Sequence, residues 1–214
     1  MAQSSSSTAS GDDLQRLQRR RKNVLRAVAV LGVLLVLVMD SSWRMAAPKL
    51  LEWLQRGGFL LILLCIFGRT WCTLYIGGNK KRELVTKGPY SVVRNPLYVF
   101  TFIGAMGVGL VAGSIVLALL FGALALLIFN AITRQEEAFM ASAFGESFTA
   151  YAARVPRFWP RFSTWQDAEE LVVRPKLVLR TFLDASLFLL AVPLLELKEL
   201  LQRLGSLPVW LHLP

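Results

Sequence analysis

The stretch Thr86-Lys87-Gly88-Pro89-Tyr90-Ser91-Val92-Val93-Arg94-Asn95-Pro96-Leu97-Tyr98 places charged, amide and phenolic side chains directly in front of a long apolar segment. Its two prolines favour an extended backbone at the residues before them, so a stiff loop is expected here. Pro96 suits the first turn of the helix that follows, where a missing N–H costs nothing. The free N–H groups of that turn then face the surroundings of Arg94, Asn95 and Tyr98, an arrangement that favours an anionic group.

The composition indicates an integral membrane protein. Of 214 residues, 55% are hydrophobic and the formal charge is +10, while the mean hydropathy is +0.51. Basic residues in such chains gather on cytoplasmic loops, where they meet anionic lipid headgroups. Nucleic acid is not an expected partner, because the basic residues lie between apolar runs and form no separate domain. Cys65 and Cys72 share one apolar segment and are expected to be free thiols, and the single histidine, His212, predicts no metal site.

The apolar segments predict an all-α, polytopic fold with about five transmembrane helices and a cytoplasmic cap after the fourth. The expected spans are 27–39, 57–76, 97–112, 115–133 and 181–197. The last of these is interrupted by charges and a proline, so an interfacial or re-entrant helix is the alternative. The chain divides into a disordered, basic N-terminal segment (1–22), N-terminal membrane helices (23–76), a core region (77–162) and a C-terminal helix region (163–214). The first span is short, so either Asp40 lies at the outer interface or the helix is packed by protein.

Charge inside and around the spans sets the expected orientation. Most Lys and Arg residues fall on the N-terminal side, in the loop before the third span and in the segment after the fourth, which predicts a cytoplasmic N-terminus and cytoplasmic core loops, at the inner membrane if the host is bacterial. Arg69 lies within the second span. Its guanidinium either snorkels to the inner surface or lines a polar cavity. The apolar C-terminal region is compatible with a homodimer contact.

The third and fourth spans must form a tight hairpin, because only Gly113 and Ser114 separate them. Small residues in the third span, Gly104, Gly107 and Gly109, allow close helix contact. The start of the third span and the end of the fourth then lie on the same side. This predicts one cluster at the inner mouth of the hairpin, made of Arg94, Asn95, Tyr98, Arg134, Glu136 and Glu137. The cluster is either an ion-pair network that fixes the hairpin to the cap, expected over 144–160, or a ligand site for a zwitterionic molecule with a lipid-soluble partner.

These residues carry a resemblance. The segment from Leu84 to Tyr98, followed one hairpin later by Glu136-Glu137, Phe144-Gly145, Tyr151 and Val155-Pro156-Arg157, resembles the isoprenylcysteine carboxyl methyltransferase and phospholipid methyltransferase superfamily over about 69–160. The resemblance implies S-adenosylmethionine as methyl donor and a lipophilic methyl acceptor that arrives through the membrane lipids. By position it implies that the donor is bound by Arg82, Leu84, Val85, Gly88, Tyr90, Asn95, Tyr98, Glu136 and Glu137, and that Arg94 and Arg134 are the catalytic residues that position the acceptor.

The resemblance leaves the acceptor open. An isoprenylcysteine-type carboxylate O-methyltransferase is the first expectation, and a phospholipid (ethanolamine) N-methyltransferase or a non-catalytic lipid-binding protein on the same scaffold are the alternatives. The family's histidine is replaced here by Asn95. Asparagine keeps hydrogen bonds but cannot act as a base.

Overall fold

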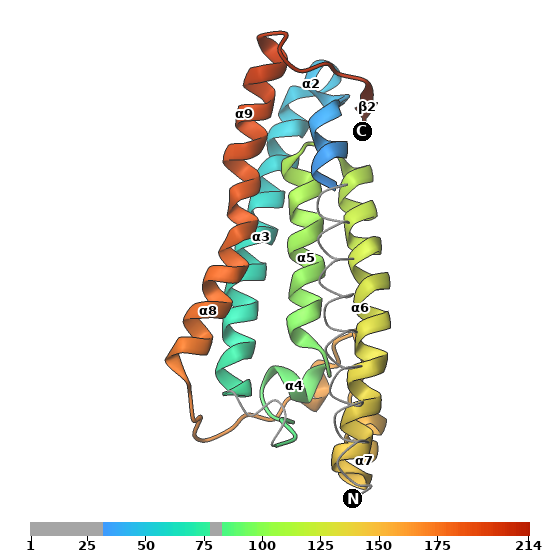
Figure 1. Ribbon diagram of the computed structural model, residues 1–214, viewed down its shortest axis with the longest axis vertical. Helices are drawn as coiled ribbons and strands as arrows, with labels where there is room; N and C mark the ends of the chain where they lie inside the picture. The colour runs from blue at the N-terminus through green and yellow to red at the C-terminus, as the bar shows by residue number, and fades with distance from the viewer. Residues whose placement is uncertain (1–31, 78–82) are drawn as a thin grey trace, which may run out of the picture.

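The computed structural model describes residues 32–77 and 83–214. Its elements follow in the order β1 (Met39–Ser41), α2 (Trp43–Ala46), α3 (Pro48–Ile76), α4 (Pro89–Val92), α5 (Pro96–Val111), α6 (Ile115–Phe144), α7 (Glu146–Arg154), the 3₁₀ helix η1 (Phe162–Thr164), α8 (Pro175–Ser186), the 3₁₀ helix η2 (Leu187–Leu190), α9 (Ala191–Arg203) and β2 (Leu211–Leu213). The long helices run side by side as a bundle (Figure 1). The predicted all-α membrane fold is confirmed.

Helix lengths in the described residues fit a bilayer. α3, α6 and the continuous rod from α8 to α9 (Pro175–Arg203) are each long and apolar enough to cross it. α5 has only 16 residues, about 24 Å at 1.5 Å per residue, so α6 projects beyond it at the end where α4 and α7 lie (Figure 1). Of the predicted first span, residues 32–38 are helical; its start, the segment 1–22 and the loop 79–82 lie outside the described residues.

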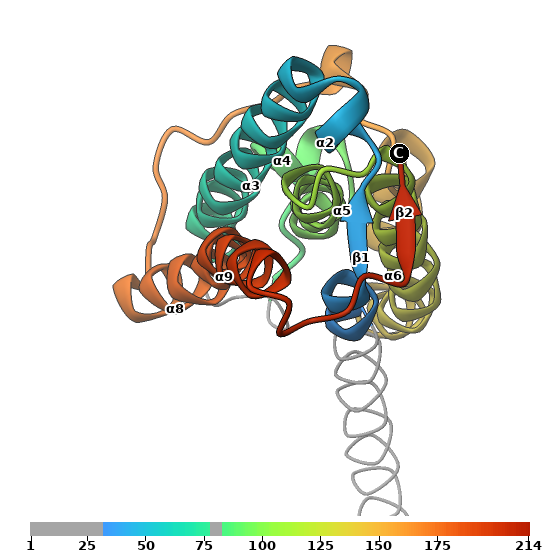
Figure 2. The same cartoon turned by 90° about the horizontal axis from the view of Figure 1, so that it is seen from above.

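α5 lies between α3 and α6 (Figure 2), and glycines allow the close approach. A Cβ on Gly107 would lie 2.8 Å from the carbonyl oxygen of Gly58 on α3, and a Cβ on Gly109 would lie 2.3 Å from the backbone N of Ala118 on α6. The turn between α5 and α6 needs Gly113, whose φ is +79°. Ser114 then caps α6, because its side chain accepts a hydrogen bond from the N–H of Leu117. The predicted tight hairpin is confirmed.

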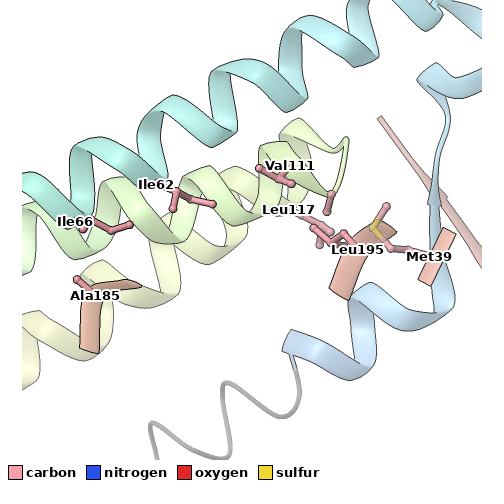
Figure 3. Packing of buried hydrophobic residues seen from close by; sticks show 8 residues of the cluster. Met39, Ile62, Ile66, Val111, Leu117, Ala185 and Leu195 are labelled. Carbon is pink, nitrogen blue, oxygen red and sulfur yellow. The ribbon is translucent and has the colours of Figure 1, made fainter. Parts of the chain in front are cut away.

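One apolar cluster joins the rod of α8 and α9 to the other helices (Figure 3). Its buried members are Met39, Ile62, Ile66, Val111, Ala112, Leu117, Ala185 and Leu195. Because lipid tails are as apolar as these side chains, close packing rather than removal from water holds this cluster together. The outward side of the rod keeps exposed leucines, such as Leu187 and Leu194, as expected for a surface in contact with lipid.

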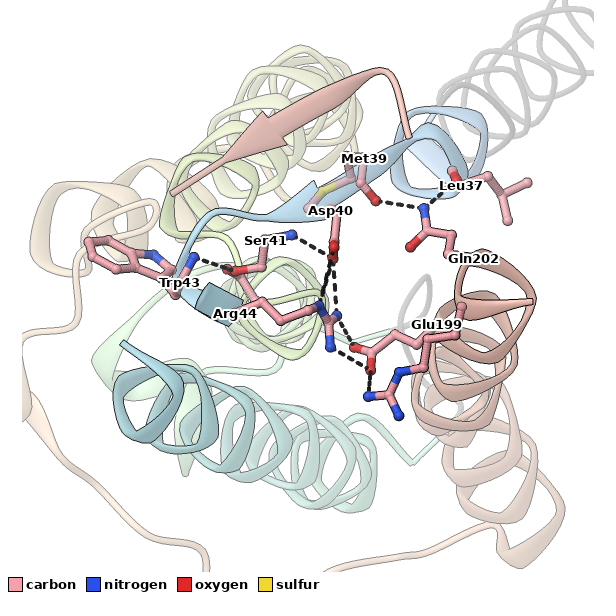
Figure 4. Close-up of polar contacts among 10 residues, drawn as sticks. Leu37, Met39, Asp40, Ser41, Trp43, Arg44, Glu199 and Gln202 are labelled. Atoms are coloured by element: carbon pink, nitrogen blue, oxygen red, sulfur yellow. Dashed lines mark hydrogen bonds and ion pairs between the residues drawn. The ribbon is translucent and has the colours of Figure 1, made fainter. Parts of the chain in front are cut away.

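The end of the bundle opposite α4 and α7 is closed by polar contacts that the sequence did not predict. β1 and β2 pair in parallel, with Met39 opposite Leu211. Asp40 does not stand alone at an interface: Arg44 donates to its Oδ1 from Nη2 at 3.0 Å and also pairs with Glu199 of α9 at 2.9 Å. The Gln202 amide donates to the carbonyl oxygen of Met39 (3.2 Å). Figure 4 shows these contacts, which tie α9 to the chain before α3.

Candidate functional site

The opening motif adopts a conformation that only glycine allows at its centre. Gly88 has φ +58°, and a Cβ there would lie 2.1 Å from the Tyr75 ring. The extended geometry expected at Gly88 is therefore not found, and within the stiff loop Pro89 begins the single helical turn α4, whose residues are all buried. Proline suits this position because its fixed φ is helical. Pro96 then begins α5, as predicted.

Backbone and side-chain hydrogen bonds fasten this motif to the chain that follows α6. The N–H of Gly88 donates to Gln166 (2.7 Å), the N–H of Arg94 to Pro156 (2.8 Å), and the N–H of Arg161 to Val92 (3.0 Å). The side chain of Thr164 donates to the carbonyl oxygen of Ser91 at 2.7 Å. The same segment reaches α3, where Trp165 stacks on Trp71 with ring centroids 5.7 Å apart. The predicted cap is therefore a cover over the motif, and it extends past residue 160.

The hairpin brings the motif to the acidic pair. α6 continues beyond Thr133 to Phe144, so Glu136 and Glu137 stand on its last turns. The Tyr98 hydroxyl lies 3.1 Å from both carboxylate oxygens of Glu136. Arg94 Nε lies 3.7 Å from Glu137 Oε1, and both side chains are largely buried. The predicted meeting of Arg94 and Tyr98 with the two glutamates is confirmed.

Arg157 belongs to this site and was not among the predicted site residues. Its guanidinium donates to Glu137 from Nη2 at 2.6 Å and from Nε at 3.1 Å, and Nη1 donates to Asn130 Oδ1 at 3.2 Å. Asn95 contributes through its amide, which donates to the carbonyl oxygen of Arg157 at 3.3 Å. The Val155-Pro156-Arg157 motif was the available signal. Two guanidiniums thus share the carboxylate of Glu137, and the buried Nε of Arg94 has no hydrogen-bond partner in the described residues, which leaves a donor for an anionic ligand.

Tyrosines line the site beside the glutamates. Tyr90 is buried and its hydroxyl has no hydrogen-bond partner in the described residues. Burial, together with nearby Cys72, Tyr151, Tyr98 and Glu136, raises the pKa of the Tyr90 hydroxyl well above its ordinary value, so it stays protonated. Tyr151 supports α4 from below, because its hydroxyl donates to the carbonyl oxygen of Tyr90 at 2.7 Å. An orphaned buried hydroxyl of this kind is a hydrogen-bonding group left for a ligand.

Apolar groups complete the surroundings. The Tyr98 ring stacks on Phe129 of α6, with centroids 4.4 Å apart. Leu84 packs against the cluster of Phe148, Tyr151 and Val155, and Val85 packs against the cluster that contains Tyr90.

Two predicted site residues are not part of this cluster. Arg134 is exposed, and its side chain makes no hydrogen bond or ion pair with another residue in 32–77 or 83–214. Arg82 lies outside the described residues. In the described ranges no group of three or more His, Cys, Asp and Glu side chains could hold a metal ion.

The chain matches one protein-family model and is similar to several known proteins. The phospholipid methyltransferase family model matches residues 58–147, which contain α5, α6 and the motif. The nickel-cobalt-cadmium resistance protein NccN of Alcaligenes xylosoxydans xylosoxydans is 36% identical over 203 residues, or 92% of each chain. The cobalt-zinc-cadmium resistance protein CzcN of Cupriavidus metallidurans is 35% identical over 193 residues, or 89% of this chain and 87% of CzcN.

A shorter match is to a methyltransferase. The protein-S-isoprenylcysteine O-methyltransferase of Schizosaccharomyces pombe is 41% identical over 78 residues, which are 36% of this chain and 33% of that enzyme. No solved structure matches the chain. The chain therefore belongs to the family of the resistance proteins NccN and CzcN, and its residues 58–147 place it in the integral-membrane methyltransferase superfamily.

Proposed function

We propose that this protein is an S-adenosylmethionine-dependent methyltransferase that transfers a methyl group to the carboxylate of a lipophilic acceptor, such as an isoprenylcysteine. The observation that carries the proposal is the single cluster in which Tyr98 contacts Glu136 while Arg94 and Arg157 share Glu137. It gathers both charge signs under a cover, beside apolar helices through which a lipid can approach. The partial likeness to an isoprenylcysteine O-methyltransferase supports the same reaction.

The residues present fit S-adenosylmethionine, whose amino-acid end is zwitterionic and whose sulfonium is a cation. Glu136 would accept hydrogen bonds from the ammonium group, and Arg94 would bind the carboxylate. The Tyr90 hydroxyl, buried without a partner in the described chain, would hydrogen-bond polar atoms of the nucleoside. The stacked rings of Tyr98 and Phe129 offer the aromatic face that favours a cation.

Methyl transfer requires mainly that the acceptor oxygen, the methyl carbon and the sulfur be aligned. S-adenosylmethionine supplies an activated methyl group when bound, and in the transfer a carbon–oxygen bond to the acceptor forms as the carbon–sulfur bond breaks, with the electron pair remaining on sulfur. The chain must orient the acceptor, exclude water and leave its nucleophile unprotonated. Arg157 would help to orient the acceptor, and the cover over α4 would exclude water.

Asn95 favours a carboxylate over an amine as the acceptor. A carboxylate is nucleophilic as it stands, whereas an ethanolamine ammonium must first lose a proton to a base. Asn95 cannot accept that proton as a histidine could. N-methylation of an ethanolamine lipid would instead require Glu136 or a tyrosine to act as the base. It remains the second candidate, and the family's description as phospholipid methyltransferases supports it.

The proposed setting is a cytoplasmic site in a protein that serves metal resistance. The basic loops around the site favour the cytoplasmic side, and the two relatives that match nearly the whole chain carry resistance to nickel, cobalt, zinc or cadmium in their names. A deletion strain should lose growth in one of these metals. Wild-type protein should restore growth, and Glu136→Gln should not.

Binding in detergent tests the proposal directly. Purified protein should bind S-adenosylhomocysteine saturably by calorimetry, and Glu136→Ala and Tyr98→Ala should abolish binding without changing thermal stability by more than a few degrees. Glu52→Ala, on the exposed end of α3, is the matched control and should bind as the wild type does. If the wild type binds neither the methyl donor nor its demethylated product, the proposal is wrong, and the scaffold serves a non-catalytic role. Mass spectrometry of products from carboxylate and ethanolamine acceptors separates O- from N-methylation.

A further inference from the structure

Arg69 is a cation inside a membrane helix with no counter-ion in the described residues. It lies on α3, seven residues before the helix ends at Ile76, about 10 Å from that end. A charge at this depth is costly, and such residues usually face a functional cavity or pair with an acid. The ion pairs among residues 32–77 and 83–214 do not include Arg69.

The guanidinium of Arg69 binds across from α3 to α5. Its Nη1 donates to the Thr101 hydroxyl, and its Nε is buried with no hydrogen-bond partner in the described chain. Thr101 is held in turn, because its hydroxyl donates to the carbonyl oxygen of Leu97 at 2.8 Å. One donor of this half-buried side chain, the buried Nε, is therefore left unsatisfied, which is unfavourable unless a ligand accepts from it.

This guanidinium stands next to the site, on its membrane side. Thr101 follows Tyr98 by three residues on α5, and side chains at this spacing are neighbours about 5–6 Å apart. On α3, Cys72 follows Arg69 by the same spacing and packs in one cluster with Tyr90. Both helices thus lead from Arg69 to the tyrosines of the site. The carboxylate head of an acceptor whose tail lies in the bilayer would then lie between Arg69 and Tyr98.

We propose that Arg69, oriented by Thr101, binds the carboxylate of the lipid acceptor. The inference rests on the proposed function and names the acceptor class as an anionic lipid or lipidated molecule. It also gives a reason for product release. Methylation converts the carboxylate into a neutral ester, which removes the charge that Arg69 holds, so the product binds more weakly than the substrate.

The test compares acid and ester binding. Two ligand pairs in detergent serve as probes: N-acetyl-S-farnesylcysteine with its methyl ester, and oleate with methyl oleate, so that prenyl and acyl acceptors are distinguished. Wild-type protein should bind at least one acid about tenfold more tightly than its ester, a difference of about 1.4 kcal/mol. Arg69→Gln should bind acid and ester equally, because it removes the charge. It should also fold, since glutamine is less costly than arginine in a bilayer.

Other variants define the roles more sharply. Arg69→Lys should keep part of the acid preference, because it retains the charge without the planar fork. Thr101→Val should reduce the preference about threefold by releasing the guanidinium. Arg56→Gln, an exposed arginine on the same helix, should behave as the wild type. Equal binding of acid and ester by the wild type in both pairs, or an acid preference that survives in Arg69→Gln, would overturn the proposal.

Binding of S-adenosylhomocysteine separates this inference from the proposed function. It should be the same in Arg69→Gln and the wild type. If the wild type shows the acid preference but does not bind S-adenosylhomocysteine, the anion site stands and the methyltransferase assignment fails. If it binds S-adenosylhomocysteine but shows no acid preference, the methyltransferase assignment stands and the role of Arg69 is wrong.

Discussion

The ion pair between Glu137 and Arg157 allows a quantitative test of the site's construction. We propose a double-mutant cycle with Glu137→Gln, Arg157→Gln and the double variant. Glu137→Gln should destabilise more than Arg157→Gln, because it leaves both Arg94 and Arg157 without their carboxylate.

The expected coupling energy follows from the geometry. Arg157 and Glu137 approach to 2.6 Å with side chains 32% and 14% exposed, so the pair is neither at the surface nor fully buried. Exposed pairs contribute about 0.2–1 kcal/mol, and removing one partner of a buried pair costs about 3–5 kcal/mol. Hydrogen bonds to charged groups contribute about 1.5–3 kcal/mol. We therefore expect a coupling energy of about 2 kcal/mol.

The measurement is the free energy of unfolding in mild detergent, from titration with sodium dodecyl sulfate followed by tryptophan fluorescence. The matched control is the exposed pair of Glu52 and Arg56 on α3, whose atoms approach to 3.3 Å with both side chains 63% exposed. Its coupling should stay below about 0.5 kcal/mol. If the two cycles give the same coupling, the cluster at Glu137 does not hold the cap to the hairpin and the reasoning fails.

Three further predictions concern α4 and its support. Gly88→Ala should destabilise by about 3 kcal/mol or more, since its positive φ and the Tyr75 ring exclude a Cβ, whereas Gly57→Ala, with open space around it, should be neutral or slightly stabilising in the same titration. Tyr90→Phe should leave stability within about 1 kcal/mol of the wild type but weaken S-adenosylhomocysteine binding about five- to tenfold by calorimetry; unchanged binding would exclude the hydroxyl as a ligand contact. Burial raises the pKa of the Tyr151 hydroxyl above the value of 10.0 found in unfolded chains, so the unfolded state loses its proton first, and stability should fall as pH rises past about 10. Tyr151→Phe should flatten that fall, and an equal fall in both proteins would contradict the assignment.

The membrane fold could be predicted because it is defined by the lengths of the apolar segments and by the glycine and proline residues that separate them. Gly113 and Ser114 left no room for a loop, and Pro96 marked a helix start, so the hairpin followed. Helix ends were less predictable: Arg134 suggested that α6 ends there, but the following Glu, Ala and Met residues are good helix formers and carry the helix into the polar region. The pairing of β1 with β2, in which Met39 lies opposite Leu211, joins two segments that are far apart in the sequence. Each strand has only three residues, too few to show an alternation of apolar and polar side chains.

For the site, the residues on the hairpin were predictable and those on the cover were not. Arg94, Tyr98, Glu136 and Glu137 lie on two helices whose relative placement the turn determines. Arg157 lies in a segment with other arginines, and nothing local in the sequence tells which of them reaches Glu137. Helical periodicity likewise does not show that Arg134 is exposed, because Arg134 precedes Glu137 by three residues and could lie on the same face of the helix.

The hydrogen bonds that join Gly88, Val92 and Arg94 to residues 156–166 imply an order of events during synthesis. α3, α5 and α6 can enter the bilayer as soon as they leave the ribosome, yet the turn with Tyr90 cannot settle until about seventy further residues have been made. A truncated chain that stops at residue 147, the end of the family match, would insert with both glutamates present and still lack a finished pocket.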